Sequence, residues 1–255
     1  MKNRTFRVVI IILTFLLCMY FPKLLENQFS INRSKLFITS LGYPFTIIII
    51  ITTLYILYKY DIIKTIAELG LKEGFLKGFL FGFISTLPMT VSSLILFKFS
   101  NNIFTYDTLI ATFIGPIMEE ILFRGYLFGE LFKKEKWGFI PASIIASVFF
   151  GIGHLYQTHN LSGALGTFLI TLIGSAWFAW LYIEHNNLWV PIWLHILMNL
   201  SWTVFQTNVP GAIGTNTTNL FRLATIIITV VYTIRYSKEH GRKINRRNLL
   251  INYVN

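Results

Sequence analysis

The chain has 255 residues, of which 54% are hydrophobic and only 13% are charged. A soluble domain is about 45–50% apolar and about 25% charged, so this composition excludes an ordinary water-exposed surface. The formal net charge of +11 could suit nucleic acid, but Lys and Arg lie in short segments between long apolar stretches. Membrane proteins fix their orientation with that pattern. We therefore expect a membrane protein whose partners include the lipid bilayer and no nucleic acid.

The apolar stretches predict the number of membrane-spanning helices. A bilayer core about 30 Å thick needs about 20 mostly apolar residues per helix. The sequence therefore predicts an all-α polytopic membrane bundle of about eight transmembrane helices, forming a single domain over residues 1–255. We interpret the first stretch as an uncleaved helix, because no small-x-small cleavage site follows it. The expected spans are 8–25, 36–58, 75–97, 108–132, 138–155, 162–184, 188–206 and 218–236.

The distribution of basic residues predicts the orientation of these helices. Most of the 22 Lys and Arg residues fall on one side of the membrane when the N-terminus is placed in the cytoplasm. We expect a multi-pass protein of the cell membrane with both termini cytoplasmic. Residues 59–73 have helical apolar spacing and are expected to lie along the cytoplasmic interface. The basic stretch from Lys238 to Arg247 is interpreted as a solvated topology signal.

The span 108–132 carries three charged residues, Glu119, Glu120 and Arg124. Charges at the centre of a membrane helix cost about 2.5–3.5 kcal/mol each on insertion scales, so they rarely lack a role. Glu120 and Arg124 are four residues apart and can pair on one helix face. Glu119 points about 100° away from Glu120 and is left over as a candidate general base. Gly115-Pro116, just before it, is expected to break or restart the helix.

Two further spans contribute polar side chains. His154 ends the fifth span after two glycines, and His195 and Asn199 stand four residues apart in the seventh. Histidine can ligate a metal, carry a proton or donate to an oxyanion, and an asparagine amide can also donate. Each residue alone has a structural alternative, such as an ion pair or a hydrogen bond between helices. Together, a free carboxylate, two imidazoles and an amide are the inventory of a water-activating hydrolytic site.

This ordered set resembles a known family. The three motifs look like those of the CPBP (CAAX-processing and bacteriocin-processing, or Abi) intramembrane proteases, which include the eukaryotic CAAX prenyl endopeptidases. The resemblance spans about residues 110 to 200, within a motif-bearing core of about 108–206. The matching motifs are Glu119-Glu120-x-x-x-Arg124, Phe150-x-x-x-His154 and His195-x-x-x-Asn199.

The resemblance implies an intramembrane endopeptidase that acts on a membrane-associated peptide or protein. It implies that Glu119 and His154 activate water, that His195 and Asn199 stabilise the oxyanion, and that Glu120 and Arg124 support the site. Zinc on His154, His195 and a glutamate is one alternative, and a site without metal is the other. A non-catalytic bacteriocin immunity or membrane scaffold protein of the same fold is the competing function, and a transporter is a third.

The same residues predict a geometry. Two imidazoles, a carboxylate and an amide cannot face lipid cheaply, so Glu119, His154, His195 and Asn199 are expected to converge on one polar cavity. The fourth, fifth and seventh helices should then be mutual neighbours. We expect Glu119 and His154 to lie within one water's reach of each other. We also expect the cavity to open towards the cytoplasmic side. His159, His185 and His240 are set aside as solvated.

Overall fold

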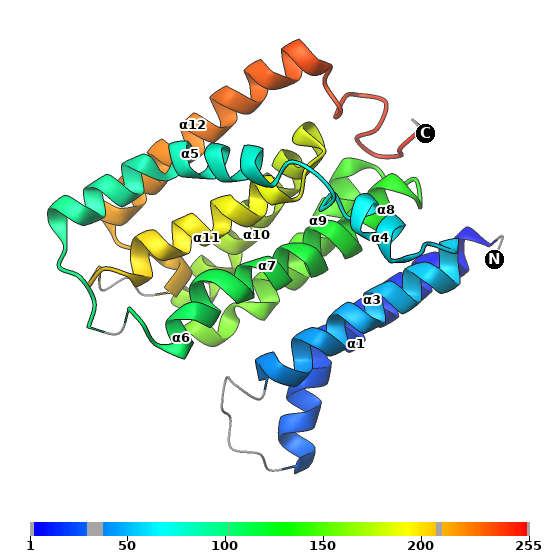
Figure 1. Ribbon diagram of the computed structural model, residues 1–255, viewed down its shortest axis with the longest axis horizontal. Coiled ribbons are helices and arrows are strands. Elements are labelled where there is room, and N and C mark those ends of the chain that lie inside the picture. Colours follow the sequence, from blue (N-terminus) through cyan, green and yellow to red (C-terminus); the bar gives the residue numbers. More distant parts are fainter. Residues whose placement is uncertain (1–2, 30–37, 102, 208–210, 254–255) are drawn as a thin grey trace.

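The computed structural model describes residues 3–29, 38–101, 103–207 and 211–253. It confirms the all-α class: the described residues form a bundle of helices, with only two isolated β-bridges (Figure 1). The elements in chain order are α1 (Arg4–Phe29), η1 (Ile38–Gly42), α3 (Tyr43–Tyr58), α4 (Ile62–Glu68), α5 (Phe75–Leu96), α6 (Tyr106–Leu109), η2 (Ile110–Ile114), α7 (Gly115–Glu119), η3 (Glu120–Phe128), α8 (Gly129–Lys133), α9 (Phe139–Gly153), η4 (Leu155–Gln157), α10 (Leu161–His185), α11 (Trp189–Thr203), η5 (Gly211–Ile213) and α12 (Asn216–His240).

Six helices within the described residues are long and apolar enough to cross a bilayer, namely Arg4–Phe21, Ser40–Tyr58, Phe75–Leu96, Phe139–Gln157, Leu161–His185 and Asn216–His240. The other two expected spans are helical as well, but they differ in form. Residues 106–133 alternate between α- and π-helical hydrogen bonding, and α11 has only 15 residues. The expected number of about eight helices is reached only when these two are included.

Residues 106–133 are called the central helix below. The chain does not break at Gly115-Pro116, because Gly115 stays in the right-handed helical region with φ −55° and ψ −55°, but an α-helical segment starts there, as the alternative of a restart predicted. The hydrogen bonding changes there from the π-helix η2 to the α-helix α7, whose first turn contains Pro116. Proline is tolerated in a first turn because its missing N–H has no partner to lose. The π-helical stretches on both sides of α7 are of the kind that is frequent at functional sites.

Close backbone contacts hold the helices around the central helix. α11 packs along α5, α9 packs along α10, and the central helix contacts α9, α10 and α11. A side-chain carbon at Gly78 would stand 2.6 Å from the backbone of Trp189, so glycine permits the α5–α11 approach. α1 and α3 form a separate pair, seen in blue at the lower right of Figure 1, and α1 also contacts the π-helix η3. α10 lies against both α9 and α11.

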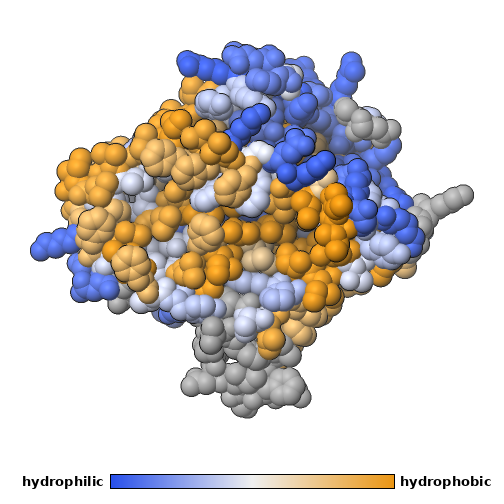
Figure 2. Space-filling model, in the orientation of Figure 1, coloured by the Kyte–Doolittle hydropathy of each residue, from blue (hydrophilic) through white to orange (hydrophobic). Residues whose placement is uncertain are grey.

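The outer surface is apolar over much of its area. Figure 2 shows a broad hydrophobic band across the molecule and hydrophilic residues gathered mainly at the end where α12 and the chain terminate. Large apolar side chains such as Ile95, Ile173 and Leu220 are more than 60% exposed. A soluble protein rarely exposes contiguous apolar surface of this kind, so this band is the face that meets lipid.

The hydrophilic end is called the basic end below. It consists of the start of α1, the α3–α4 and α8–α9 connections, the α10–α11 connection and the C-terminal segment 241–253. The exposed cations in and beside these segments include Arg4, Lys59, Lys64, Lys136, Arg242, Lys243, Arg246 and Arg247. Buried polar contacts join its parts: Glu135 is fully buried and accepts from Arg7 Nε at 2.7 Å and from the Tyr58 hydroxyl at 2.6 Å.

The C-terminal segment packs against this end through its backbone, while its basic side chains stay exposed, as expected of a solvated signal. The first N–H groups of α9 donate to the segment, from Gly138 to the Leu250 carbonyl at 3.0 Å and from Phe139 to the Asn248 carbonyl at 2.8 Å. The carboxylate of Glu184 accepts from the backbone of Lys243 at 3.1 Å. The segment thus accepts hydrogen bonds from N–H groups at the start of α9, which would otherwise need water as their acceptor.

We predict that Gly138→Ala releases this segment. A side-chain carbon at Gly138 would collide with the backbone of Leu250, which cannot move aside as a flexible side chain could. Trypsin should then cut after Arg242 to Arg247 faster in the detergent-solubilised variant than in the wild type. Gly174→Ala is the matched control, because a side-chain carbon there meets nothing within 4 Å. Equal cleavage of Gly138→Ala and wild type would contradict the observed docking.

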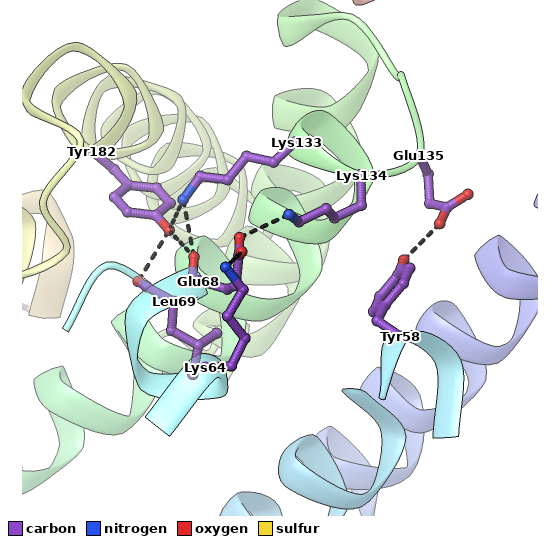
Figure 3. A network of polar contacts seen from close by, with 8 residues as sticks. All are labelled: Tyr58, Lys64, Glu68, Leu69, Lys133, Lys134, Glu135 and Tyr182. Atoms are coloured by element: carbon purple, nitrogen blue, oxygen red, sulfur yellow. Dashed lines mark hydrogen bonds and ion pairs between the residues drawn. The ribbon is translucent and has the colours of Figure 1, made fainter. Parts of the chain in front are cut away.

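A second polar network fixes α4 to the basic end (Figure 3). Glu68 pairs with Lys64 and with Lys134, each at 2.8 Å. Lys133 donates to the Tyr182 hydroxyl at 2.6 Å and to the Glu68 carbonyl at 3.1 Å. α4 meanwhile exposes Ile62 and other isoleucines, as the predicted interfacial helix should.

The network makes stability depend on pH. Burial acts to raise the pKa of Glu68, but hydrogen bonds and charges from Lys134 and Lys64 outweigh it, so the pKa lies below the ordinary glutamate value. A lowered folded-state pKa contributes stability above the unfolded value of about 4.3, and that contribution disappears as the pH falls through the folded value. We expect the unfolding temperature of wild type to fall more between about pH 5 and pH 3 than that of Glu68→Gln. Parallel pH profiles would contradict this role.

Candidate active site

Glu119 is the last residue of α7 and the most accessible charged group of the central helix interior. Its side chain is 38% exposed, and its Oε2 lies 3.9 Å from Nε2 of His195 on α11. This separation is too long for a hydrogen bond and short enough for one shared water or substrate atom. The carboxylate that the sequence left without a local partner therefore faces an imidazole from another helix.

Glu120 holds that imidazole in place. Its side chain is fully buried, and Oε1 accepts from Arg124 Nη1 at 2.9 Å and contacts His195 Nδ1 at 2.8 Å. A carboxylate facing Arg can only accept here, so Nδ1 of His195 carries the proton and Nε2 is the atom presented to Glu119. The ion pair expected from the four-residue spacing is thus present, and it also orients the histidine.

Two phenyl rings enclose the Arg124 guanidinium. Its central carbon lies 4.2 Å from the Phe150 ring centroid and 5.4 Å from that of Phe178. The Phe150 ring also packs against His154, with centroids 4.4 Å apart, and lies 6.5 Å from His195. Phe150 is therefore the common neighbour that brings α9, the central helix and α11 to one place. The phenylalanine of the Phe150-x-x-x-His154 motif is thus explained by packing, because its ring contacts both Arg124 and His154.

His154 follows directly after the last residue of α9. Its Nδ1 lies 2.8 Å from the Phe150 carbonyl, so Nδ1 donates and the other nitrogen, Nε2, remains an acceptor when the ring is neutral. The contact anchors the ring to its own helix. The imidazole that faces Glu119 is that of His195. The Phe150 ring is the neighbour that the two histidines share.

Asn199 lies further along α11. Its amide donates to the Ala111 carbonyl of η2 at 3.0 Å. Ala111 precedes Glu119 by about two helical turns, roughly 12 Å at 1.5 Å per residue. Asn199 therefore ties α11 to the first half of the central helix, and one amide N–H remains for a further acceptor. The expected mutual contact of the fourth, fifth and seventh helices is corrected in one respect, because α9 packs mainly on α10 and α11 mainly on α5, while both contact the central helix.

The residues present do not fit a preformed zinc site. No three His, Cys, Asp or Glu side chains in the described part of the chain are gathered closely enough to hold a metal ion. Structural and catalytic zinc sites take three or four protein ligands.

Burial around Glu119 differs between the two directions along the central helix. From Glu120 to Phe132 every residue of the central helix is buried, so the path from Glu119 to the basic end is filled by protein. On the other side, Ile152 is 41% exposed and Tyr156 is 76% exposed, close to His154 in sequence. Helix direction explains the difference, because α9 starts at the basic end and reaches His154 only after its last turn.

Several residues of this region carried no sequence signal. Phe178 covers His195 from α10 with ring centroids 5.6 Å apart, and the Tyr43 hydroxyl lies 3.8 Å from where a side chain on Gly115 would begin. His185, expected to be solvated, is within 2.9 Å of the Thr233 hydroxyl and stacks on Tyr236. An aromatic residue in an apolar span looks the same in sequence whether it faces lipid or a site.

Comparison with known proteins finds relatives of the segment that carries the three motifs. Residues 101–201 match the family described as Type II CAAX prenyl endopeptidase Rce1-like. The chain is 40% identical over 98 residues to the Bacillus subtilis (strain 168) protein named "Putative membrane peptidase YdiL", covering 38% of this chain and 36% of that protein. It is 31% identical over 105 residues to "Membrane-embedded CAAX protease MroQ" of Staphylococcus aureus (strain USA300), covering 39% of each. The chain thus spans well under half the length of these relatives, and no solved structure matches it significantly.

Proposed function

We propose that the protein is an intramembrane endopeptidase. The premise is that the chain belongs to the CPBP family of membrane proteases, through residues 101–201. Its substrate would be a membrane-associated peptide or protein. The observation that carries the proposal is the pairing of the accessible Glu119 carboxylate with His195, whose ring is fixed by the buried Glu120–Arg124 ion pair. A purely structural ion pair would not need an accessible second carboxylate beside it.

The proposed reaction is a hydrolysis with Glu119 as the general base. Glu119 takes a proton from water while the water oxygen bonds to the peptide carbonyl carbon, and Nε2 of His154 accepts a hydrogen bond from the same water. Glu119 then gives its proton to the leaving nitrogen as the C–N bond breaks. The products are a carboxylate and an amine. A general base of this kind contributes about 10²- to 10⁴-fold to the rate.

His195 and Asn199 are proposed to stabilise the oxyanion of the tetrahedral intermediate. With a proton on both ring nitrogens, His195 donates through Nδ1 to Glu120 and through Nε2 to the oxyanion. In that state the oxyanion and the Glu120 carboxylate balance two cations, Arg124 and His195, while Glu119 holds the proton taken from water, which suits a site with little water. Asn199 would supply its remaining amide N–H. Glu120 and Arg124 act as positioning residues, because they hold the ring that touches the reacting atoms.

The metal alternative has a direct test. If the described ligand geometry is also that of the working enzyme, dialysis of the purified protein against a strong chelator should leave cleavage of a substrate peptide unchanged. Loss of activity after dialysis, with recovery on adding Zn²⁺ alone, would show a metal site that forms only in another state. A metal-free enzyme should also show no bound zinc by elemental analysis after purification without added metal.

The proposed activity is tested by the mass of cleavage products. Candidate membrane-associated peptides are co-expressed with wild type or with Glu119→Gln, and peptide fragments are measured by mass spectrometry. A fragment pair that adds one water to the precursor and appears only with wild type supports the peptidase. An immunity or scaffold protein would instead give no fragments, and any protective effect would be the same with Glu119→Gln as with wild type.

A further inference from the structure

The side of the membrane from which the site is reached follows from three structural observations. The first is the concentration of exposed cations at the basic end, including Lys59, Lys136, Arg242 and Arg246. At the opposite end Arg222 is one of the few cations in the described residues, and it is tied to the Ala212 carbonyl at 2.7 Å. Cytoplasmic segments of membrane proteins carry the excess of Lys and Arg, so the basic end faces the cytoplasm.

The second observation is the barrier between Glu119 and the basic end. The central helix is continuously buried from Glu120 to Phe132, with Tyr126 and Leu131 fully covered. Between this stretch and the basic end, Lys133 donates a hydrogen bond to the Tyr182 hydroxyl, and the C-terminal segment covers the start of α9. A peptide arriving from the basic end would have to displace both layers. The polar network and the docked segment therefore close this route.

The third observation is a groove in the opposite half of the molecule, beside the residue that precedes Glu119. It has a volume of about 490 Å³ and lies between the start of α3 and the first half of the central helix. Its walls include Tyr43, Tyr106, Ile114 and Met118, and Met118 directly precedes Glu119. The residues at this end of the central helix and of α9, such as Tyr106 and Tyr156, are exposed. An apolar peptide segment in the outer half of the bilayer can therefore approach Glu119 from the side.

We infer, on the basis of the proposed peptidase function, that the substrate is a peptide presented from the extracytoplasmic side of the membrane. Its apolar segment occupies the groove beside Met118, and its scissile bond lies in the outer half of the bilayer or at the outer surface. The reaction then follows a translocation step, because the peptide must already have crossed the membrane. A cytoplasmic tail that has not been exported would not reach Glu119.

The orientation is tested without any substrate. In a Cys18→Ala background, which removes the single and buried cysteine, one cysteine is placed at Tyr156 or at Tyr253. These tyrosines are equally accessible, at 76% and 72%, and lie at opposite ends of the molecule. A membrane-impermeant maleimide should label Tyr156→Cys in intact cells and Tyr253→Cys only after permeabilisation. The reverse pattern would overturn the inference.

The substrate side is tested with two reporter peptides. Both contain the same apolar span and the same flanking segment that wild type cuts, placed on the extracytoplasmic flank in one reporter and on the cytoplasmic flank in the other. We expect wild type to cut only the first, and Glu119→Gln to cut neither. Cleavage of the cytoplasmic reporter alone would overturn the inference while leaving the peptidase intact. If wild type cuts neither, the proposed function fails, and the labelling experiment still decides which way the site faces.

Discussion

Replacing Glu119 by glutamine is expected to reduce peptide cleavage by about 10²- to 10⁴-fold, the range that a general base contributes. The amide keeps the size of the side chain but cannot take a proton from water. Folding should be unaffected, because the Glu119 side chain is 38% exposed and its Oε2 lies 3.9 Å from the His195 ring, beyond hydrogen-bond distance. The variant should be as abundant in the membrane as wild type and should unfold at nearly the same temperature in detergent.

Glu73→Gln is the matched control for this prediction. It makes the same chemical change at an exposed glutamate beside the start of α5, at the basic end and far from α7. We expect it to cleave substrate at the wild-type rate. Initial rates over a range of substrate concentrations separate a change in kcat from a change in KM. Full activity of Glu119→Gln would exclude this carboxylate as the base and would require another water-activating group.

Arg124→Ala should have the largest effect on stability. Removing one partner of a buried ion pair typically costs about 3–5 kcal/mol, because the other charge stays buried and unmatched. Here the unmatched group is Glu120, which is fully buried, and the space between the Phe150 and Phe178 rings is emptied at the same time. We expect little folded protein after extraction in detergent and a markedly lower unfolding temperature for what remains.

The double variant Glu120→Met/Arg124→Met separates stability from positioning. Replacing both members of a buried ion pair by apolar residues is often neutral or stabilising, so the unfolding temperature should recover relative to Arg124→Ala. Activity should stay low, because His195 has lost the carboxylate that orients its ring. Recovery of both stability and activity would show that the pair has only a structural role. An unfolding temperature for Arg124→Ala equal to that of wild type would contradict the observed burial.

The sequence by itself determined the fold class and the residues of the candidate site. Apolar runs about 20 residues long can only be satisfied as helices in lipid, so their number and order follow from composition. The Glu120–Arg124 pair also followed from sequence, since a four-residue spacing places two side chains on one helix face. Buried charges are costly enough that Glu119, His154 and His195 stood out against an apolar background.

Only the tertiary structure decided how these residues meet. His195 is 75 positions from Glu120 along the chain, and no local rule relates them. Its approach depends on the short helix α11 beginning within the fold, where Leu188 is completely buried against Gly70. The continuous path of the central helix through Pro116 depended in the same way on the π-helical turn before it. Only the structure showed that the central helix is buried from Glu120 to Phe132, because apolar residues that face lipid and those that face protein are alike in sequence.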